Sequence, residues 1–312
     1  MLGRTADGLY WMFRHIERAE NIARLIDAGL RMSLTRTGEA DDEWDSVLRS
    51  AGMHASYLQN HEKVTGSEAI HFMLSETNNP SSVLSAITSA RLNGRMVRTA
   101  LTRETWEAMN ECWIAVKAMM SRTVRDTEMP AMIDAIKQHT ALIRGSFHGT
   151  MLRNEIYSFA RIGTFIERAD NTARILDVKY YVLLPSISYV GSSLDNVQWE
   201  SILRSVSAHR SYSWVYDTDY RPINIADFLI LNRRMPRSLA FCHAAISENL
   251  LNLERDYGQR HPAHDTAQRI LSQCEHRTID EIFDRGLHEF LLDFIIQNNR
   301  LGSEIARAYN FH

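Results

Sequence analysis

The side chains best suited to chemistry in this 312-residue chain lie in two short segments of nearly the same sequence. Residues 16–27 read IERAENIARLID, and residues 166–177 read IERADNTARILD. Carboxylates can transfer protons, and guanidinium groups bind carboxylates or phosphates through paired hydrogen bonds. The sequence assigns no catalytic residue. The candidate binding residues are the charged and carboxamide side chains that recur: Glu17, Arg18, Asn21, Arg24, Glu167, Arg168, Asn171 and Arg174.

These polar residues must be positioned by helices, because apolar residues recur around them at helical spacing. On a helical wheel, Asn21 and Arg24 fall within roughly 60° of Glu17, beside an apolar stripe that includes Ile16 and Ala23. Three interpretations are open: a solvated face with local ion pairs, a buried charge network between helices, and a ligand-binding or catalytic surface. We favour the buried network, because a buried Glu or Arg needs a partner.

The similarity between the two segments continues along the chain. Residues 44–50 (WDSVLRS) match residues 199–205 (WESILRS), and residues 80–83 (PSSV) match residues 236–239 (PRSL). A shared order of matches at a nearly constant offset indicates an internal duplication, with the join near residues 146–152.

The chain is predicted to be all-α, because 14 Gly and 6 Pro leave few turns. We expect two diverged copies of a helical bundle unit, residues 1–148 and 149–312, packed as a pseudo-twofold duplication; one continuous helical domain is the alternative. Pro80 and Pro236 are expected to begin helices at the first turn, and residues 180–190 to form a loop rather than a strand. Further helices are expected to open at about Glu43 and Gln198, and to cover residues 103–121, 130–150, 263–275 and 278–309.

The composition argues against nucleic-acid and membrane partners. A formal net charge of -3 gives no attraction for nucleic acid or an anionic membrane. No apolar run approaches the ~18 residues of a membrane span, and charges interrupt the N-terminus too early for a secretory signal. Cys112, Cys242 and Cys274 show no metal-ligand spacing, so we expect buried, reduced thiols. These features predict a cytoplasmic protein.

Two further groups of side chains are secondary candidates. Arg91 and Arg95, with Arg98, share one helical face and could hold a phosphate or a carboxylate; a solvated face is the alternative. The second group recurs at three-residue spacing in both copies and could line a pocket or pack in the core: His54, Tyr57, His209 and Tyr212. His54 and His61 have no equivalent metal set in the second copy, and the histidines do not repeat in a Glu-x-x-His spacing, so no metal site is predicted.

The duplicated segments, together with residues 9–11 (LYW), 90–95 (ARLNGR) and 287–309, resemble the alpha-E family over essentially the whole chain. That family is predicted to be helical, carries a Glu-Arg motif and typically occurs as a tandem duplication. Leu92 departs from the pattern, since an acidic residue is expected there; Glu248 fills the matching place in the second copy.

The resemblance implies a function only indirectly. Family members are encoded beside circularly permuted ATP-grasp proteins, transglutaminase-like proteins and sometimes a proteasome-like hydrolase, which implies a system for peptide synthesis or modification. We therefore expect a partner subunit or substrate-binding component of an ATP-grasp amide ligase, with a transglutaminase-like protein as a further partner. No intrinsic cofactor is expected, because the chain has no Gly-rich nucleotide loop; ATP and Mg²⁺ would lie on the partner ligase.

Two alternatives from other functional classes stay open. The protein could be an independent enzyme that uses Glu17 and Glu167 as general acid and base in a cleft between the repeats. It could also be a purely structural interaction module whose charged stripes hold the repeats together. Assembly into a homo-oligomer is open as well.

Overall fold

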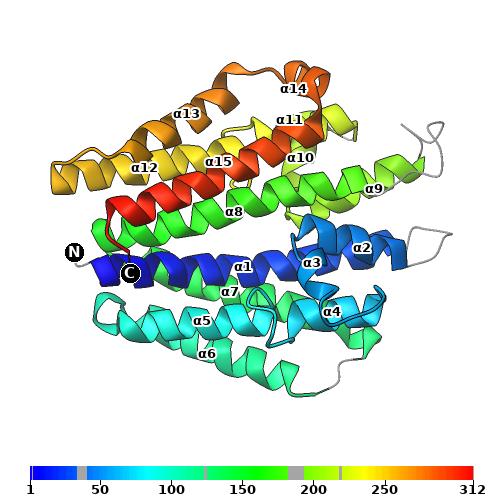
Figure 1. The fold of residues 1–312 in the computed structure, drawn as a ribbon, viewed down its shortest axis with the longest axis horizontal. Helices are drawn as coiled ribbons and strands as arrows, with labels where there is room; N and C mark the ends of the chain where they lie inside the picture. The colour runs from blue at the N-terminus through cyan, green and yellow to red at the C-terminus, as the bar shows by residue number, and fades with distance from the viewer. Residues whose placement is uncertain (2, 34–40, 123–124, 182–192, 218–219, 312) are drawn as a thin grey trace.

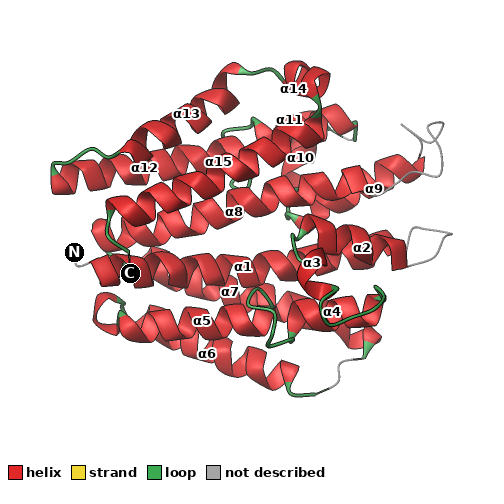
Figure 2. Cartoon of the chain, viewed as in Figure 1, coloured by secondary structure: helices red, strands yellow, loops and turns green. Residues whose placement is uncertain are grey.

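The computed structural model describes residues 1, 3–33, 41–122, 125–181, 193–217 and 220–311. Helices make up most of this part of the chain, and no strand occurs in it (Figure 2). The predicted all-α fold is therefore confirmed. Besides two short 3-10 turns, the helices are α1 (Gly3–Ser33), α2 (Asp41–Ser50), α3 (His54–Tyr57), α4 (Gly66–Leu74), α5 (Val83–Met96), α6 (Arg103–Met120), α7 (Met129–Thr150), α8 (Glu155–Tyr181), α9 (Ser193–Ser205), α10 (His209–Tyr216), α11 (Pro222–Ile230), α12 (Leu239–Tyr257), α13 (Pro262–His276), α14 (Ile279–Arg285) and α15 (Leu287–Ala308).

The long helices lie side by side, with α1 and α8 at the centre of the molecule (Figure 1). Helices α5, α6 and α7 lie on the α1 side, and α12, α13 and α15 lie on the α8 side. The two chain ends meet, since the ring of Phe311 lies 5.2 Å from that of Tyr10. The helix boundary between α7 and α8 coincides with the predicted join, although the duplication itself and its division into two domains stay predictions.

Small residues allow α1 and α8 to approach closely. Ala19, Ala23 and Ala169 are fully buried. At Gly163 a Cβ atom would lie only 2.3 Å from the carbonyl oxygen of Tyr10, a distance that no side chain tolerates. The polar stripe of each helix is consequently held within reach of the other helix.

The expectation that Pro80 and Pro236 begin helices is wrong. Each proline lies in a turn, two residues before a serine N-cap, Ser82 or Ser238. The serine hydroxyl accepts a hydrogen bond from a backbone N–H of the first helical turn and so fixes the start of α5 or α12.

The predicted C-terminal helix over residues 278–309 is interrupted. Gly286 separates α14 from α15 with a φ of 99°, which side chains rarely adopt. Helices α6, α7 and α13 match their predicted ranges closely, whereas α2 and α9 begin before the expected Glu43 and Gln198. The predicted loop at 180–190 falls almost wholly outside the described residues. None of the described helices combines the length and apolar character needed to cross a membrane.

Candidate functional site

The Glu-Arg segments of α1 and α8 build two clusters of charge. We call the first the sealed centre; it consists of Glu17, Glu20, Arg24, Arg144, Arg168 and Arg237. The side chains of Glu17 and Glu20 have no exposed surface. Arg168 of α8 donates from Nε to Glu17 Oε1 at 2.7 Å, and Arg24 donates from Nη2 to Glu20 Oε1, also at 2.7 Å. Two arginines from outside these helices contact both carboxylates: Arg144 of α7 and Arg237, from the turn before α12.

The arginines of the sealed centre keep both carboxylates ionised. Burial alone would raise the pKa of Glu17, but the charge of Arg168, reinforced by Arg144 and Arg237, outweighs it and holds the pKa well below its usual range. The same balance of burial against arginine charges lowers the pKa of Glu20 to about 2. Burial and then the charge of Arg24 lower the pKa of Arg237 to about 9, so it stays cationic at neutral pH. These carboxylates are therefore poor proton donors.

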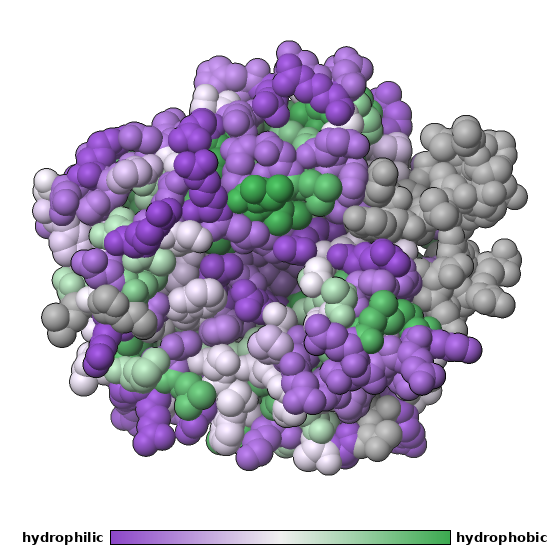
Figure 3. Space-filling view, viewed as in Figure 1, coloured by the Kyte–Doolittle hydropathy of each residue, from purple (hydrophilic) through white to green (hydrophobic). Residues whose placement is uncertain are grey.

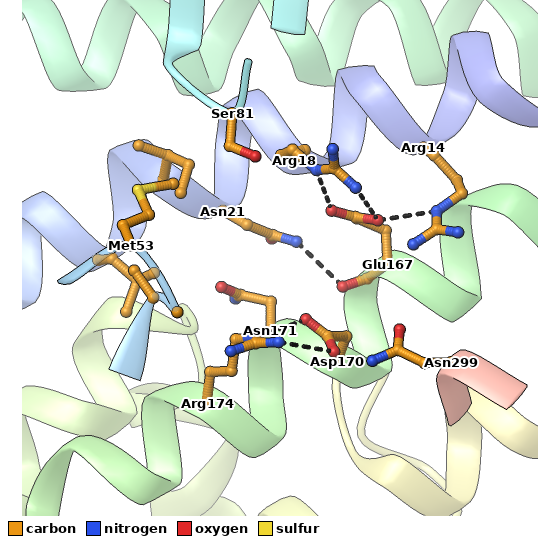
Figure 4. A pocket seen from close by; sticks show the side chains of 14 residues that line it. Arg14, Arg18, Asn21, Met53, Ser81, Glu167, Asp170, Asn171, Arg174 and Asn299 are labelled. Carbon is orange, nitrogen blue, oxygen red and sulfur yellow. Dashed lines mark hydrogen bonds and ion pairs between the residues drawn. The ribbon is translucent and has the colours of Figure 1, made fainter. Parts of the chain in front are cut away.

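The second cluster, which we call the open centre, consists of Glu167, Asp170, Arg14, Arg18 and Arg174. Arg18 donates from Nε to Glu167 Oε1 at 2.6 Å, and Arg14 donates from Nε to Glu167 Oε2 at 2.9 Å (Figure 4). Arg174 donates from Nε to Asp170 Oδ2 at 2.6 Å. Burial opposes the ionised form of Glu167, but the two α1 arginines prevail and lower its pKa to about 2.

A pocket of about 260 Å³ opens beside this second cluster, between α1 and α8. Figure 3 shows the face hollowed between these helices. Asn21, Asn171, Ser81 and Asn299 add polar groups to the wall (Figure 4). Asn171 is only 4% exposed, and its Nδ2 is buried with no hydrogen-bond partner among the described residues. A buried amide without a partner is costly, so this wall is poised to bind a polar group.

In each centre, an arginine at the same position of the repeated segment donates a hydrogen bond to a backbone carbonyl at the end of a neighbouring helix. Arg24 donates from Nη1 to the carbonyl oxygen of Ser205 at 2.9 Å, and Arg174 donates from Nη1 to that of Ser50 at 3.2 Å. Each of these serines ends the second helix of the opposite half, α9 or α2. The two centres thus share these turn contacts and the Glu-Arg pairs between α1 and α8. Arg144 and Arg237 contact only the sealed centre, and Arg14 contacts only the open one.

The sequence-predicted residues divide between the two centres. The interpretation of the stripes as solvated helix faces is wrong, because Glu17, Arg24 and Arg168 are buried. These three lie in the sealed centre. The other five line the pocket: Arg18, Asn21, Glu167, Asn171 and Arg174.

Sequence reasoning missed Arg14, Arg144, Arg237 and Ser81 as parts of the site. Arg144 carried no signal, because it is brought in only by the packing of α7 on α1. A signal did exist for Arg237: it stands opposite Ser81 in the matched tetrapeptides PSSV and PRSL. A difference in charge at a matched position could have pointed to the asymmetry of the two centres.

The secondary arginine candidates lie away from the pocket. Arg91 donates from Nε to Asn110 Oδ1 at 2.8 Å, and its guanidinium lies 4.4 Å from the ring centroid of Trp113. Arg95 lines a separate hollow beside His15. These contacts favour a packed helix face for Arg91, while its role and that of Arg95 stay predictions.

The histidine-tyrosine pairs also lie outside the pocket. Each histidine lies within hydrogen-bond distance of a carboxylate on the preceding helix, at 2.7 Å in the first half and 3.0 Å in the second. Each tyrosine is fully buried against aromatic neighbours, as core packing requires. The residues are His54, Tyr57, His209 and Tyr212.

The three cysteines are buried and form no disulfide, as expected. Burial raises the pKa of each thiol, Cys112, Cys242 and Cys274, to about 12, so these thiols are protonated at neutral pH. Within the described part of the chain, no group of three or more His, Cys, Asp or Glu side chains is arranged to hold a metal ion.

The fold and the site define an all-helical protein in which Glu-Arg pairs join two central helices. A family model named Alpha-E, described as a predicted alpha-helical domain with a conserved ER motif, matches residues 1–309. The chain therefore belongs to the Alpha-E family. Searches of curated proteins and of solved structures each returned no match.

Proposed function

We propose that this protein is a partner subunit that binds the substrate of an ATP-grasp amide ligase, in a system for peptide synthesis or modification. The observation that carries the proposal is the pocket between α1 and α8, which is lined by the Glu-Arg segments of both helices. Its wall includes the buried Asn171 Nδ2, which has no hydrogen-bond partner among the described residues. ATP and Mg²⁺ would lie on the ligase, whose presence the family resemblance implies. A transglutaminase-like protein is a second expected partner.

The charges of the pocket suit binding better than proton transfer. A general acid or base works best with a pKa near the operating pH. Burial opposed by arginine charge leaves the pKa of Glu167 at about 2, and Glu17 is held below its usual range in the same way. Only Glu167 of the two lines the pocket. The independent-enzyme alternative is therefore less well supported than a binding role.

The purely structural alternative is favoured by the sealed centre alone. There, Glu17 and Glu20 are enclosed by arginines from α1, α7, α8 and the turn before α12. Such a network fixes how these elements pack. We assign this structural role to the sealed centre and the binding role to the pocket.

Co-purification with an ATP-grasp protein encoded beside it, which the family resemblance leads us to expect, tests the proposal. ATP consumption by that ligase is then measured over an amino-acid panel, with and without this chain. Stable association and altered turnover are expected, and Asn171→Ala should weaken the effect on turnover. Arg103→Gln is the matched control, because Arg103 is 79% exposed and pairs only with Glu107 among the described residues. Failure to associate, with ATP turnover unchanged, would contradict the proposal.

A further inference from the structure

Arg161 of α8 is a half-buried cation that has no counterion among the described residues. No hydrogen bond or ion pair joins it to them. Its guanidinium lies over two aromatic rings instead, 4.3 Å from the centroid of Phe165 and 5.8 Å from that of Tyr157. Arg168, two turns further along the same helix, is by contrast bonded to Glu17 of α1. The five N–H donors of Arg161 are therefore unused within the described part of the chain.

The surroundings of Arg161 disfavour its positive charge. Burial lowers the pKa of its guanidinium, and the charges of Arg168 and Arg153 act in the same direction, while the charge of Glu17 opposes them without prevailing. An arginine nevertheless stays protonated in proteins at neutral pH. An anion beside Arg161 would offset this unfavourable charge, and a guanidinium with unused donors can hold such an anion by charge-assisted hydrogen bonds.

A cavity of about 380 Å³ opens beside this guanidinium, between α8, α12 and the turn before α8. Small-molecule sites have volumes of roughly 300–1,000 Å³. The turn supplies Arg153, whose guanidinium lies 4.1 Å from the ring centroid of Tyr157, the same ring that Arg161 approaches. The rings of Phe165 and Phe241, with centroids 5.9 Å apart, form an apolar part of the wall. The cavity thus combines two guanidinium groups with an apolar surface.

The charges that line the cavity suit a ligand with a single negative charge. Besides Arg153 and Arg161, the described lining includes one charged side chain, the exposed Glu248 of α12, which forms no ion pair with either arginine. The net charge of the lining is therefore 2 − 1 = +1. One carboxylate would bring this charge to zero, whereas a dianionic phosphate would leave an excess negative charge beside Glu248.

We propose that this cavity binds a carboxylate that carries an apolar group. Arg161 donates hydrogen bonds to the carboxylate, and the apolar group packs against the aromatic wall. Arg153 adds positive charge, since its guanidinium is already bonded to the carbonyl oxygens of His148 and Met151. The cavity shares no lining residue with the pocket between α1 and α8, so this second site goes beyond the proposed function and is tested separately.

Calorimetric titration of the full chain tests the proposal with four probes that share a phenyl group. 3-Phenylpropionate is the carboxylate, 3-phenylpropionamide is its neutral analogue, 3-phenylpropylamine is the cation, and phenyl phosphate is the dianion. The carboxylate should bind at least about tenfold more tightly than the amide, because only the carboxylate accepts hydrogen bonds with charge on both partners. No binding of the carboxylate, binding of the amide or the amine that is equally tight, or tighter binding of phenyl phosphate would overturn the proposal.

Two substitutions in the lining should change the affinity for 3-phenylpropionate in opposite directions. Arg161→Gln removes the unpaired charge and should weaken binding at least about tenfold. Glu248→Gln removes the exposed negative charge and should strengthen binding by about two- to fivefold, as expected of an exposed charge. Arg103→Gln, on an exposed residue outside the cavity, is the control and should leave the affinity unchanged.

The sign of each effect decides the proposal. Unchanged affinity in a folded Arg161→Gln variant would refute it, and so would unchanged or weaker binding by Glu248→Gln. If Arg161→Gln does not fold, Glu248→Gln still decides, because its side chain is exposed and forms no ion pair with either arginine of the cavity.

Discussion

The sealed and open centres are built from nearly the same helical segment, but the first is fully buried and the second borders a pocket. In the sealed centre, Arg237 and Arg144 close around Glu17 and Glu20 until no carboxylate surface remains. In the open centre, the small side chain of Ser81 lines a pocket in which Asn171 Nδ2 has no hydrogen-bond partner among the described residues. The arginines that α7 and the turn before α12 supply therefore distinguish a Glu-Arg stripe that stabilises the packing from one that borders a pocket.

Acidification should produce the largest effect, because it discharges both centres. The folded-state pKa values of Glu20 and Glu167 lie near 2, below the ordinary value of 4.5, and that of Glu17 is also lowered. Their stabilisation is therefore present above pH 4.5 and is lost as the pH falls from 4.5 towards 2, by about 3 kcal/mol for Glu20 or for Glu167. Urea unfolding at pH 7, 4.5, 3 and 2 measures the loss. A free energy of unfolding that stays constant below pH 4.5 would contradict these shifts.

Glu17→Gln should be the most destabilising of the single substitutions compared here. It leaves the buried guanidinium of Arg168 without its carboxylate, and breaking a buried ion pair costs about 3–5 kcal/mol. Urea unfolding at pH 7 measures the change. Glu107→Gln is the surface control, since the exposed Arg103–Glu107 pair contributes about 1 kcal/mol or less. Equal losses in the two variants would show that the sealed centre is not structural.

Glu167→Gln should cost less than Glu17→Gln, in the same urea assay. Its partners Arg14 and Arg18 keep 13% and 22% of their side chains exposed, so water in the pocket can solvate them after the carboxylate is removed. The loss should be about 1.5–3 kcal/mol, the range for a hydrogen bond to a charged group. A loss as large as that of Glu17→Gln would mean that the open centre is as dry as the sealed one.

The sequence predicted the helices and the motif better than it predicted the partners of the motif. The stripe geometry of Glu17 and Arg24 follows from helical periodicity, and burial of that stripe was the favoured interpretation. Arg144 could not be found, because its contact with Glu17 depends on how α7 packs on α1. The break at Gly286 was missed for another reason: the flanking segments share one apolar period, and only the backbone angle separates them.

The smallest expected change in the free energy of unfolding is that of Asn171→Ala, which we compare with Asn21→Ala at the matched position. Asn171→Ala removes an amide whose Nδ2 has no hydrogen-bond partner in the described part of the chain. The free energy of unfolding should therefore change by less than about 1 kcal/mol, or should rise because an unsatisfied buried group is gone. Asn21→Ala removes an amide bonded to Glu167 and Arg237 and should cost about 1–3 kcal/mol.

The same urea assay compares the two asparagine variants, and ligase turnover supplies the contrast. Asn171→Ala should weaken the effect of this chain on ligase turnover while leaving stability intact, because the Asn171 carboxamide lines the pocket without holding the helices together. If Asn171→Ala destabilised the fold as much as Asn21→Ala, the amide would have a structural partner and the open centre would be a second structural network. If only Asn21→Ala lowers the free energy of unfolding, the sealed centre has the structural role and Asn171 is available to bind a ligand.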